Sequence, residues 1–374
     1  KQRSPELPSP MQRSDTLVVG WDIGGAHLKA CLTRDGQVID VAQWACPLWQ
    51  GLDQIDIALQ QAQARWPALG SDTRHAITMS GEMVDAFEHR EEGVQRIADR
   101  LAQVLRGEVR LYGGDLGWIA PADAARCWTQ IASANWLATA QHAATVFRDG
   151  LLVDIGSTTT DLIALANGRV QTASRSDHER LASGELVYHG VVRTPLCALA
   201  RHVAFRGHPV NVMNEWFATT ADVYRMTGEL DPTHDQQPSA DARSKDRAAT
   251  RQRLARMIGL DARDAEDDEW LALAKAWRQA QIEEIAASLT RMMDTRCGTT
   301  SAGTIVTAGC GAFLVPDLAA RVPALTGWPL RSYGCDVARI AATDDGAADA
   351  SKADWAQVCA PSVAVASLYA QEPC

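Results

Sequence analysis

The sequence lacks the features that mark several common classes of protein. No apolar run approaches the roughly 20 residues of a membrane-spanning helix. No Cys-x-x-Cys pair occurs among the nine cysteines, an odd number for a disulfide framework. Acidic residues outnumber basic ones, with 46 Asp and Glu and 36 Lys and Arg. We therefore expect free thiols in a reducing cytoplasm, no membrane segment and no nucleic-acid partner.

The first residues also lack the apolar segment of a secretory signal. Residues 1–14 carry three prolines and are otherwise mostly polar. This composition predicts a disordered N-terminal extension over 1–14, with Met11 as a candidate start of translation. The hydrophobic content of 46% in 374 residues is nevertheless ample for a large core.

An internal repeat is the main positive signal. The segments 18–38 and 151–170 align without a gap when Asp22 is matched to Asp154. Each copy reads as a strand, an aspartate, a glycine turn, a strand, a second turn and a strand. The second turns are an Asp-Gly and an Asn-Gly pair, which are strong hairpin signals because both central residues need positive φ. Two copies in register predict two lobes, each opened by one copy.

The first turn of each copy has the residue types of a phosphate-binding loop. Glycine lets the backbone bend and bring its N–H groups close to an anion. The aspartates that end the first strands would face each other across a cleft. They suit Mg²⁺ or Mn²⁺, because such an ion takes one or two carboxylates plus phosphate oxygens. We expect metal contacts from Asp22 and Asp154. The predicted phosphate-binding residues are Gly24, Gly25, Ala26, Lys29, Gly156, Ser157, Thr158 and Thr159.

Strand and helix patterns alternate along the rest of the chain, which indicates an α/β fold. Lobe I is predicted over 15–145 and lobe II over 146–355, with a polar surface loop at 228–251. A C-terminal helical segment over 356–374 is expected to pack back toward lobe I. The predicted helices span 54–66, 92–106, 132–144, 271–293 (one or two helices) and 361–370.

The glycine-turn segments resemble the ASKHA superfamily, which includes actin, Hsp70 and hexokinases. Residues 22–29 resemble its first phosphate motif, 154–161 the second, 133–140 the first connecting helix, and 309–311 the motif on the nucleoside side. This resemblance implies a duplicated actin/Hsp70/sugar-kinase-like (RNase H-like) fold of two lobes with a central cleft.

Further motifs resemble the hydantoinase A/oxoprolinase family within that superfamily. They are D-I-G-S-T-T-T-D at 154–161 and G-E-L-V-Y-H-G-V-V-R-T-P at 184–195. Three more resemble a subgroup associated with tetrahydromethanopterin-linked one-carbon metabolism and methylotrophy: G-W-D-I-G-G-A-H-L-K at 20–29, C-P-L-W-Q-G-L-D at 46–53, and T-T-A-D-V-Y-R-M-T-G-E-L at 219–230.

That subgroup includes synthases of methanofuran biosynthesis. The resemblance implies a cytoplasmic transferase of methylofuran biosynthesis. Such an enzyme would join an aminomethylfuran-methyl diphosphate to the phenol of (glutamyl)tyramine and release diphosphate. Its partners would then be small molecules, and a homo-oligomer is compatible with this interpretation.

This chemistry needs a bound leaving group and a base near the phenol oxygen. His27 is a candidate base because it projects from the first turn, and Asp161 is another; the sequence does not choose between them and Glu82 or Asp85. The predicted catalytic residues are Asp22, His27, Asp154 and Asp161. The residues expected on the substrate or nucleoside side are Glu82, Asp85, Asn135, Arg193, Gly309 and Gly311. We expect Tyr188 and most of the 12 tryptophans in the core, with Trp21 as the exception that contacts substrate.

Two other functions share the same phosphate cradle. An ATP-dependent small-molecule kinase or oxoprolinase-like enzyme would need space for adenine near 309–311, and ATP is a cofactor only in that case. A nucleotide-gated actin- or Hsp70-like module is the non-catalytic alternative. The expected absence of a long extra substrate-binding domain argues against its chaperone form.

Overall fold

The computed structural model describes residues 17–296, 302–342 and 349–373. The predicted extension over 1–14 lies outside these ranges. Within them, no helix combines the length and apolar character needed to cross a membrane. The seven cysteines in the described ranges are free thiols, as the sequence predicts.

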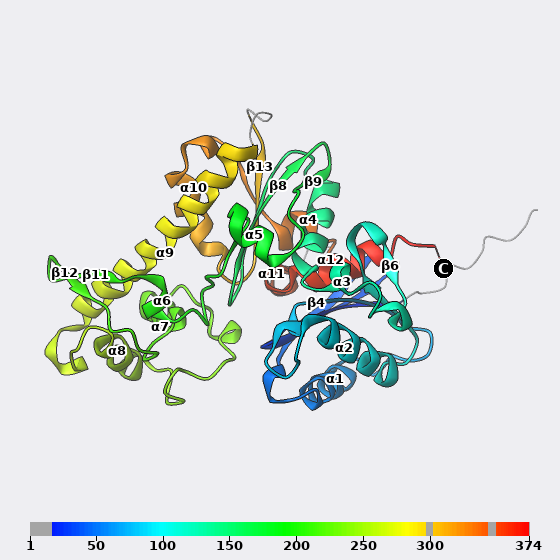
Figure 1. The fold of residues 1–374 in the computed structure, drawn as a ribbon, viewed down its shortest axis with the longest axis horizontal. Helices are drawn as coiled ribbons and strands as arrows, with labels where there is room; N and C mark the ends of the chain where they lie inside the picture. Colours follow the sequence, from blue (N-terminus) through cyan, green and yellow to red (C-terminus); the bar gives the residue numbers. More distant parts are fainter. Residues whose placement is uncertain (1–16, 297–301, 343–348, 374) are drawn as a thin grey trace, which may run out of the picture.

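The first copy of the repeat forms the centre of a six-stranded sheet. Its strands, in spatial order, are β3 (Gln37–Ala45), β2 (His27–Arg34), β1 (Leu17–Ile23), β4 (Arg74–Met79), β5 (Glu108–Tyr112) and β6 (Trp118–Ile119). Strands β4 and β5 run parallel to β1, whereas β2 and β3 are antiparallel. Helices α1 (Asp53–Arg65) and α2 (Arg90–Val104) lie on the outer side of this sheet (Figure 1) and contact β3 and β5, respectively. The short α3 (Trp128–Ile131) contacts α2.

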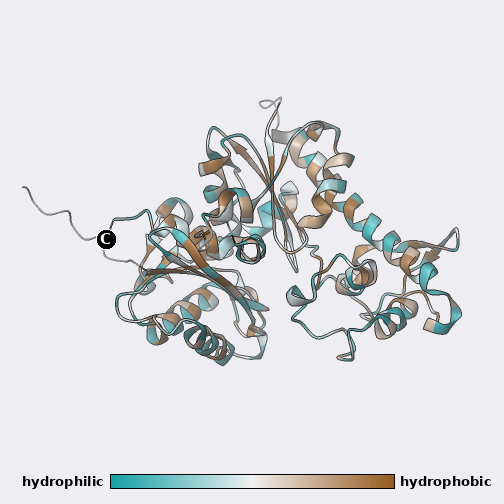
Figure 2. Ribbon diagram, turned by 180° about the vertical axis from the view of Figure 1, so that it is seen from behind, coloured by the Kyte–Doolittle hydropathy of each residue, from teal (hydrophilic) through white to brown (hydrophobic). Residues whose placement is uncertain are grey.

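The second copy forms the centre of the other large sheet. Its strands, in spatial order, are β10 (Leu186–Val187), β8 (Thr160–Ala166), β7 (Gly150–Ile155), β13 (Thr304–Ala308) and β14 (Leu330–Ser332), with β9 (Arg169–Gln171) also paired to β8. Helix α5 (Asp177–Ser183) precedes β10 and contacts it, and α10 (Val315–Arg321) follows β13. Figure 2 shows mainly apolar strands in both sheets, as expected for sheets covered on two faces.

Equivalent turns connect the strands in the two copies, so the predicted duplication is confirmed. The Gly24 N–H donates to the His27 carbonyl at 2.9 Å, and the Gly156 N–H donates to the Thr159 carbonyl at 2.8 Å. The second turns are also equivalent, because Asp35 and Gly36 have φ of 51° and 76°, and Asn167 and Gly168 have φ of 55° and 74°.

Two stacked helices separate the sheets. Helix α4 (Asn135–Val146) contacts β8 and β9, while α12 (Ala360–Tyr369) contacts β1, β2, β4 and α4. The contact with β1 is close, because a Cβ placed on Gly20 would lie 2.0 Å from the Ser362 carbonyl oxygen. Helix α11 (Ala350–Val358) joins this layer and contacts β3 and β13. Two sheets with this topology and helical layer form the two-lobed actin/Hsp70/sugar-kinase fold.

A helical subdomain lies between β10 and β13 in the sequence, which corrects the expectation of a chain without an extra domain. Figure 1 shows it beside the first lobe, joined to the second sheet by the long helix α9. Its elements are α6 (Leu196–Leu199), β11 (His202–Phe205), β12 (His208–Asn211), α7 (Thr220–Thr227), α8 (Arg247–Arg256) and α9 (Asp267–Arg296). The single helix α9 replaces the one or two predicted, and it contacts α6, α7, α8 and β11.

The polar segment 228–251 belongs to this subdomain and is not a simple surface loop. It includes the first turn of α8, and Asp235, Gln237 and Ser239 within it are buried. Asp235 accepts hydrogen bonds from Arg225 at 2.6 and 2.9 Å. Much of the segment is irregular and exposed, as expected of a loop, but some of its polar side chains pair with one another inside the protein, so polarity did not indicate exposure at those positions.

The Gly20 contact between β1 and α12 predicts a strong effect of a single methyl group. Gly20→Ala places Cβ against the Ser362 carbonyl and the Ala366 backbone. We expect a loss of about 3 kcal/mol in the free energy of unfolding, because a backbone cannot yield as a flexible side chain does. Urea denaturation measures the change. Gly70→Ala is the control, since a Cβ there meets no atom within 4 Å, and equal stability of the two variants would contradict the prediction.

Candidate active site

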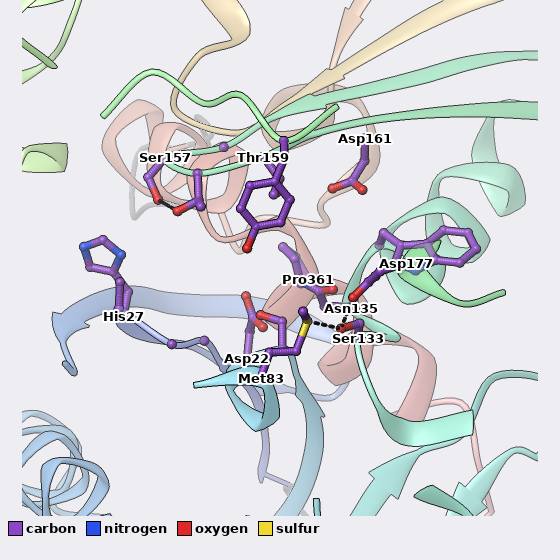
Figure 3. Close-up of a pocket in the computed structure, with 18 of the residues that line it drawn as sticks. Asp22, His27, Met83, Ser133, Asn135, Ser157, Thr159, Asp161, Asp177 and Pro361 are labelled. Atoms are coloured by element: carbon purple, nitrogen blue, oxygen red, sulfur yellow. Dashed lines mark hydrogen bonds between the residues drawn. The ribbon is translucent and has the colours of Figure 1, made fainter. Parts of the chain in front are cut away.

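The two first turns face a common cavity of about 410 Å³ that is lined by residues from both lobes. A volume of this size suits a small-molecule ligand. Figure 3 shows Asp22, His27, Ser157, Thr159 and Asp161 around it. The predicted site residues that it brings together are Asp22, Gly24, Gly25, Ala26, His27, Lys29, Asp85, Asn135, Asp154, Gly156, Ser157, Thr158, Thr159, Asp161 and Arg193.

The turns present backbone N–H groups that have no partner. In the described part of the chain, the amides of Gly25 and Ala26 and those of 157–159 donate to no acceptor. The second turn is supported from behind, because the Val192 and Arg193 N–H groups donate to the Ser157 carbonyl at 3.1 and 2.9 Å. The Ser157 carbonyl oxygen is therefore occupied, while the N–H groups of 157–159 stay available. Such concave groups of amides bind anions.

The carboxylates at the strand ends are paired in register with residues of the neighbouring strands. Asp22 lies opposite Lys29, and Asp154 lies opposite Asp161. Burial raises the pKa of Asp22 to about 6, and burial followed by the nearby Asp161 charge raises the pKa of Asp154 to about 7. Ionising these two carboxyls in the folded protein therefore costs free energy unless a further cation binds beside them.

A divalent ion fits this pair if a ligand completes its coordination. Asp22 is 4% exposed, and its Oδ1 has no hydrogen-bond partner within the described residues. No group of three or more metal-ligating side chains occurs in those residues. An ion bound by Asp22 and Asp154 would thus need further oxygens from phosphate or water, which is the usual mode for Mg²⁺.

Two cations accompany the carboxylates. Burial opposes the charge of Lys29, but the carboxylate of Asp22 and other acidic groups near it outweigh burial and raise its pKa. Arg193 lines the cavity and forms no ion pair with any residue that the structure describes. Its guanidinium lies 5.4 Å from the centre of the Trp49 ring. A partly buried guanidinium without an ion-pair partner in the described residues is suited to an anionic ligand.

Three other predicted acids and bases differ in their surroundings. Asp161 accepts a hydrogen bond from Arg180 at 2.7 Å. Asp85 is exposed at the rim of the cavity. Burial lowers the pKa of His27 to about 3, with Lys29 and Arg193 adding to the effect, so its imidazole is neutral near pH 7.

Glu82 does not line the cavity and is buried behind it. Its Oε1 accepts hydrogen bonds from Ser133 at 2.9 Å and Arg90 at 3.0 Å. It is 1% exposed. The sequence predicts Glu82 in a loop on the substrate side. In the structure its carboxylate instead holds Ser133, which does line the cavity.

Gly309 and Gly311 also lie outside the cavity lining. Their N–H groups donate to the carbonyls of Gln357 and Ile155, both at 2.8 Å. Gly309 has φ of 83°, and a Cβ there would lie 2.5 Å from the Asp154 Oδ1. These glycines therefore let β13 and the following turn approach Asp154 closely, and their amides are already used.

The prediction for the aromatic residues was wrong in both directions. Trp21 is 1% exposed and donates from Nε1 to the His75 Nδ1 at 3.0 Å, so it belongs to the core. Tyr188 and Trp49 are 55% and 41% exposed and line the cavity. Both lie within motifs that carry the family resemblance, at 46–53 and 184–195, which is the signal that could have identified them.

Sequence comparison assigns the family. The sequence model of the hydantoinase/oxoprolinase family matches residues 74–325. This match covers more than half of the chain, so the protein belongs to the hydantoinase/oxoprolinase family.

Two curated relatives are synthases from methanogens. The (4-{4-[2-(gamma-L-glutamylamino)ethyl]phenoxymethyl}furan-2-yl)methanamine synthase of Methanocaldococcus jannaschii is 28% identical over 303 residues, which are 80% of this chain and 88% of that protein. The synthase of the same name from Methanococcus vannielii is 28% identical over 144 residues, 38% of this chain and 64% of that protein. Among solved structures, component A of the Acidaminococcus fermentans (R)-2-hydroxyglutaryl-CoA dehydratase aligns over 96% of this chain and 100% of its own, at 9% identity and a TM-score of 0.44.

The raised pKa of Asp154 predicts a pH-dependent effect of its neutralisation. With a pKa of about 7 in the folded state and 3.8 as the ordinary value, its protonated form stabilises the fold at low pH, and that contribution is lost as the pH rises through 7. Asp154→Asn removes the cost of ionisation. We expect it to match the wild type at pH 4 and to exceed it by about 2 kcal/mol in unfolding free energy at pH 8.

Urea denaturation in EDTA at the two pH values measures this difference. Asp72→Asn is the control, because Asp72 is exposed and lies outside the cavity. An Asp154→Asn effect that is the same at pH 4 and pH 8 would contradict the electrostatic account.

Proposed function

We propose that this protein is an ether-forming synthase that displaces diphosphate from a furanylmethyl diphosphate with the phenol of a tyramine derivative. The observation that carries the proposal is the site itself: two turns with unpartnered amides, two cations and the carboxylates of Asp22 and Asp154 face one cavity that also contains exposed aromatic rings. The names of the two methanogen synthases describe a product that contains a phenoxymethyl–furan ether. The pathway would be the biosynthesis of a methanofuran-type cofactor.

The reaction breaks one C–O bond and forms another. The bond between the furanylmethyl carbon and the diphosphate oxygen breaks, and its electron pair leaves with diphosphate. The phenol oxygen bonds to the same carbon and loses its proton. The main task of the protein is then to hold the leaving group, exclude water and position the phenol. Asp161 is the candidate acceptor for the phenol proton.

The leaving group would be bound by the turn amides together with Lys29 and Arg193. Negative charge grows on the diphosphate as the bond breaks, and preorganised N–H donors and cations stabilise it most at that moment. Asp22 and Asp154 would hold Mg²⁺, which supplies further positive charge against the phosphate oxygens when bound.

Tyr188 and Trp49 would provide the wall for the aromatic substrates. Both side chains are exposed and line the cavity. Flat, weakly hydrated furan and phenol rings gain from contact with such faces. Asp177, on the side of the cavity away from His27 in Figure 3, suits the ammonium group of an aminomethylfuran.

The ATP-dependent alternative shares this cradle but has less support. The glycine motif at 309–311 lies outside the cavity lining, and the amides of both its glycines are already hydrogen-bonded. These positions therefore offer few donors for a nucleoside.

A direct assay separates the two functions. The protein is mixed with Mg²⁺ and a furanylmethyl diphosphate plus tyramine or γ-glutamyltyramine, and in parallel with ATP in place of the diphosphate. We expect diphosphate and an aryl ether in equal amounts in the first reaction and no ADP in the second. ADP formation without ether would overturn the proposal.

Lys29 provides the matching variant. Lys29→Met keeps the length of the side chain but removes the charge beside the leaving group, so we expect kcat/KM to fall about 10²- to 10³-fold. Lys275→Met, on the exposed side of α9, should leave the rate unchanged. Ether formation by Lys29→Met at the wild-type rate would show that the charge of Lys29 does not act on the leaving group.

Tyr188 tests the binding of the aromatic substrates. Tyr188→Ala should raise the KM for the phenol about tenfold while kcat changes little, because it removes a ring contact worth about 1 kcal/mol. Trp216→Ala is the control, since Trp216 is 64% exposed and lies outside the cavity lining. An unchanged KM in Tyr188→Ala would place the phenol elsewhere in the cavity.

A further inference from the structure

A segment of the helical subdomain crosses to the first lobe and contacts the phosphate-binding turn. We name residues 234–239 the crossing segment. Gln236 exchanges hydrogen bonds with Gln43 on β3, at 3.2 Å between side chains and 3.4 Å to the Gln43 carbonyl. The side chain of Gln237 is buried and bonds to Ala26 and His27. The segment therefore connects the subdomain to the first turn of lobe I.

Ion pairs on its subdomain side hold the crossing segment in place. Asp235 is buried, lies between Arg225 and Lys245, and accepts from the Lys245 Nζ at 3.1 Å. Arg225 also donates to Asp222 at 2.9 Å. Because Asp235 is fixed by two cations, the next residues have little freedom, and Gln237 is presented to the turn in one orientation.

The Ala26 carbonyl determines which way the Gln237 amide faces. A carbonyl oxygen only accepts hydrogen bonds, so the atom 3.0 Å from it must be the amide nitrogen, Nε2. The same nitrogen lies 3.1 Å from the His27 Nε2. An NH₂ group has two hydrogens and no acceptor capacity, so the second hydrogen points to the imidazole. The His27 Nε2 must then accept and carries no proton.

It follows that His27 is neutral and has its proton on Nδ1. The Nδ1 has no hydrogen-bond partner among the described residues, and His27 lines the cavity beside the turn of Ser157 (Figure 3). Burial, and after it the positive charges of Lys29 and Arg193, disfavour a second proton on the imidazole and lower its pKa. His27 thus offers the cavity an N–H donor, while its lone pair is used by Gln237.

We infer that Gln237 is a positioning residue that holds His27 as an Nδ1–H donor to the diphosphate leaving group, and that His27 does not act as the general base. This inference rests on the proposed function for the identity of the anion. No proton is transferred in this role, since the N–H group only stabilises the charge that develops on the phosphate oxygen. This interaction connects the first lobe to the helical subdomain. His27 lies on β2 of the first lobe, and Gln237, which orients its imidazole, belongs to the subdomain.

Nuclear magnetic resonance tests the tautomer without any substrate. Long-range ¹H–¹⁵N correlation spectra of the labelled full chain distinguish Nδ1–H, Nε2–H and doubly protonated imidazoles, and His27→Asn assigns the signal. We expect His27 to stay in the neutral Nδ1–H form between pH 5 and pH 8. In Gln237→Glu the carboxylate can only accept a hydrogen bond. His27 should therefore change to a form with a proton on Nε2, either neutral or doubly protonated. A wild-type imidazole with Nε2–H, or one that titrates near pH 6.5, would overturn the inference.

Kinetics tests the role of the donor. Gln237→Leu and Gln237→Glu should lower kcat/KM for diphosphate release about 10- to 100-fold, as expected for the loss of one hydrogen bond to a charged group. Gln236→Leu is the matched control: it removes the neighbouring contact between lobes but not the one to His27, so its spectrum and rate should equal those of the wild type.

His27 variants separate a donor from a base. An asparagine amide can place an N–H group near the position of Nδ1, so His27→Asn should keep at least tenfold more activity than His27→Ala. Equal loss in both variants would overturn the donor role. If the spectra agree with the Nδ1–H form but no variant and no wild-type protein releases diphosphate, the proposed function fails and with it the donor role, while the tautomer assignment stands.

Discussion

The close approach of α12 to β1 is the constraint on which the site depends. Gly20 leaves no room for a side chain against the helix backbone, and Asp22 lies two residues further along the same strand. Helix α4 fixes the second sheet to the other side of α12. The two glycine turns face one cavity because two sheets share this thin helical layer, and small residues make the layer thin.

Electrostatic imbalance is the second property of the site. Burial raises the pKa of the two carboxyls at the strand ends, while unpartnered amides and Arg193 face the same space. Neither set is satisfied by the protein alone. A metal–diphosphate complex carries both the cation that the carboxylates lack and the anion that the amides and Arg193 lack, so one ligand would relieve both deficits.

Local patterns predicted much of this arrangement. The paired hairpins and the positive φ at Asp35 and Asn167 follow from residues adjacent in the sequence, and the cavity between the turns follows from the repeat itself. Contacts between distant residues were not predictable in the same way. Trp21 is buried, and its indole donates a hydrogen bond to His75 on the neighbouring strand β4. Gln237 lies at the site because ion pairs of Asp235 hold this polar segment inside the protein. Polarity in a sequence does not tell a buried ion pair from an exposed loop.

A crystal structure with Mg²⁺ and diphosphate tests the central claim most directly. The account predicts diphosphate between the two turns, with oxygens accepting from the amides of Ala26 and of 157–159 and with Mg²⁺ near Asp22 and Asp154. Diphosphate bound by one turn alone, or outside the cavity, would contradict the account.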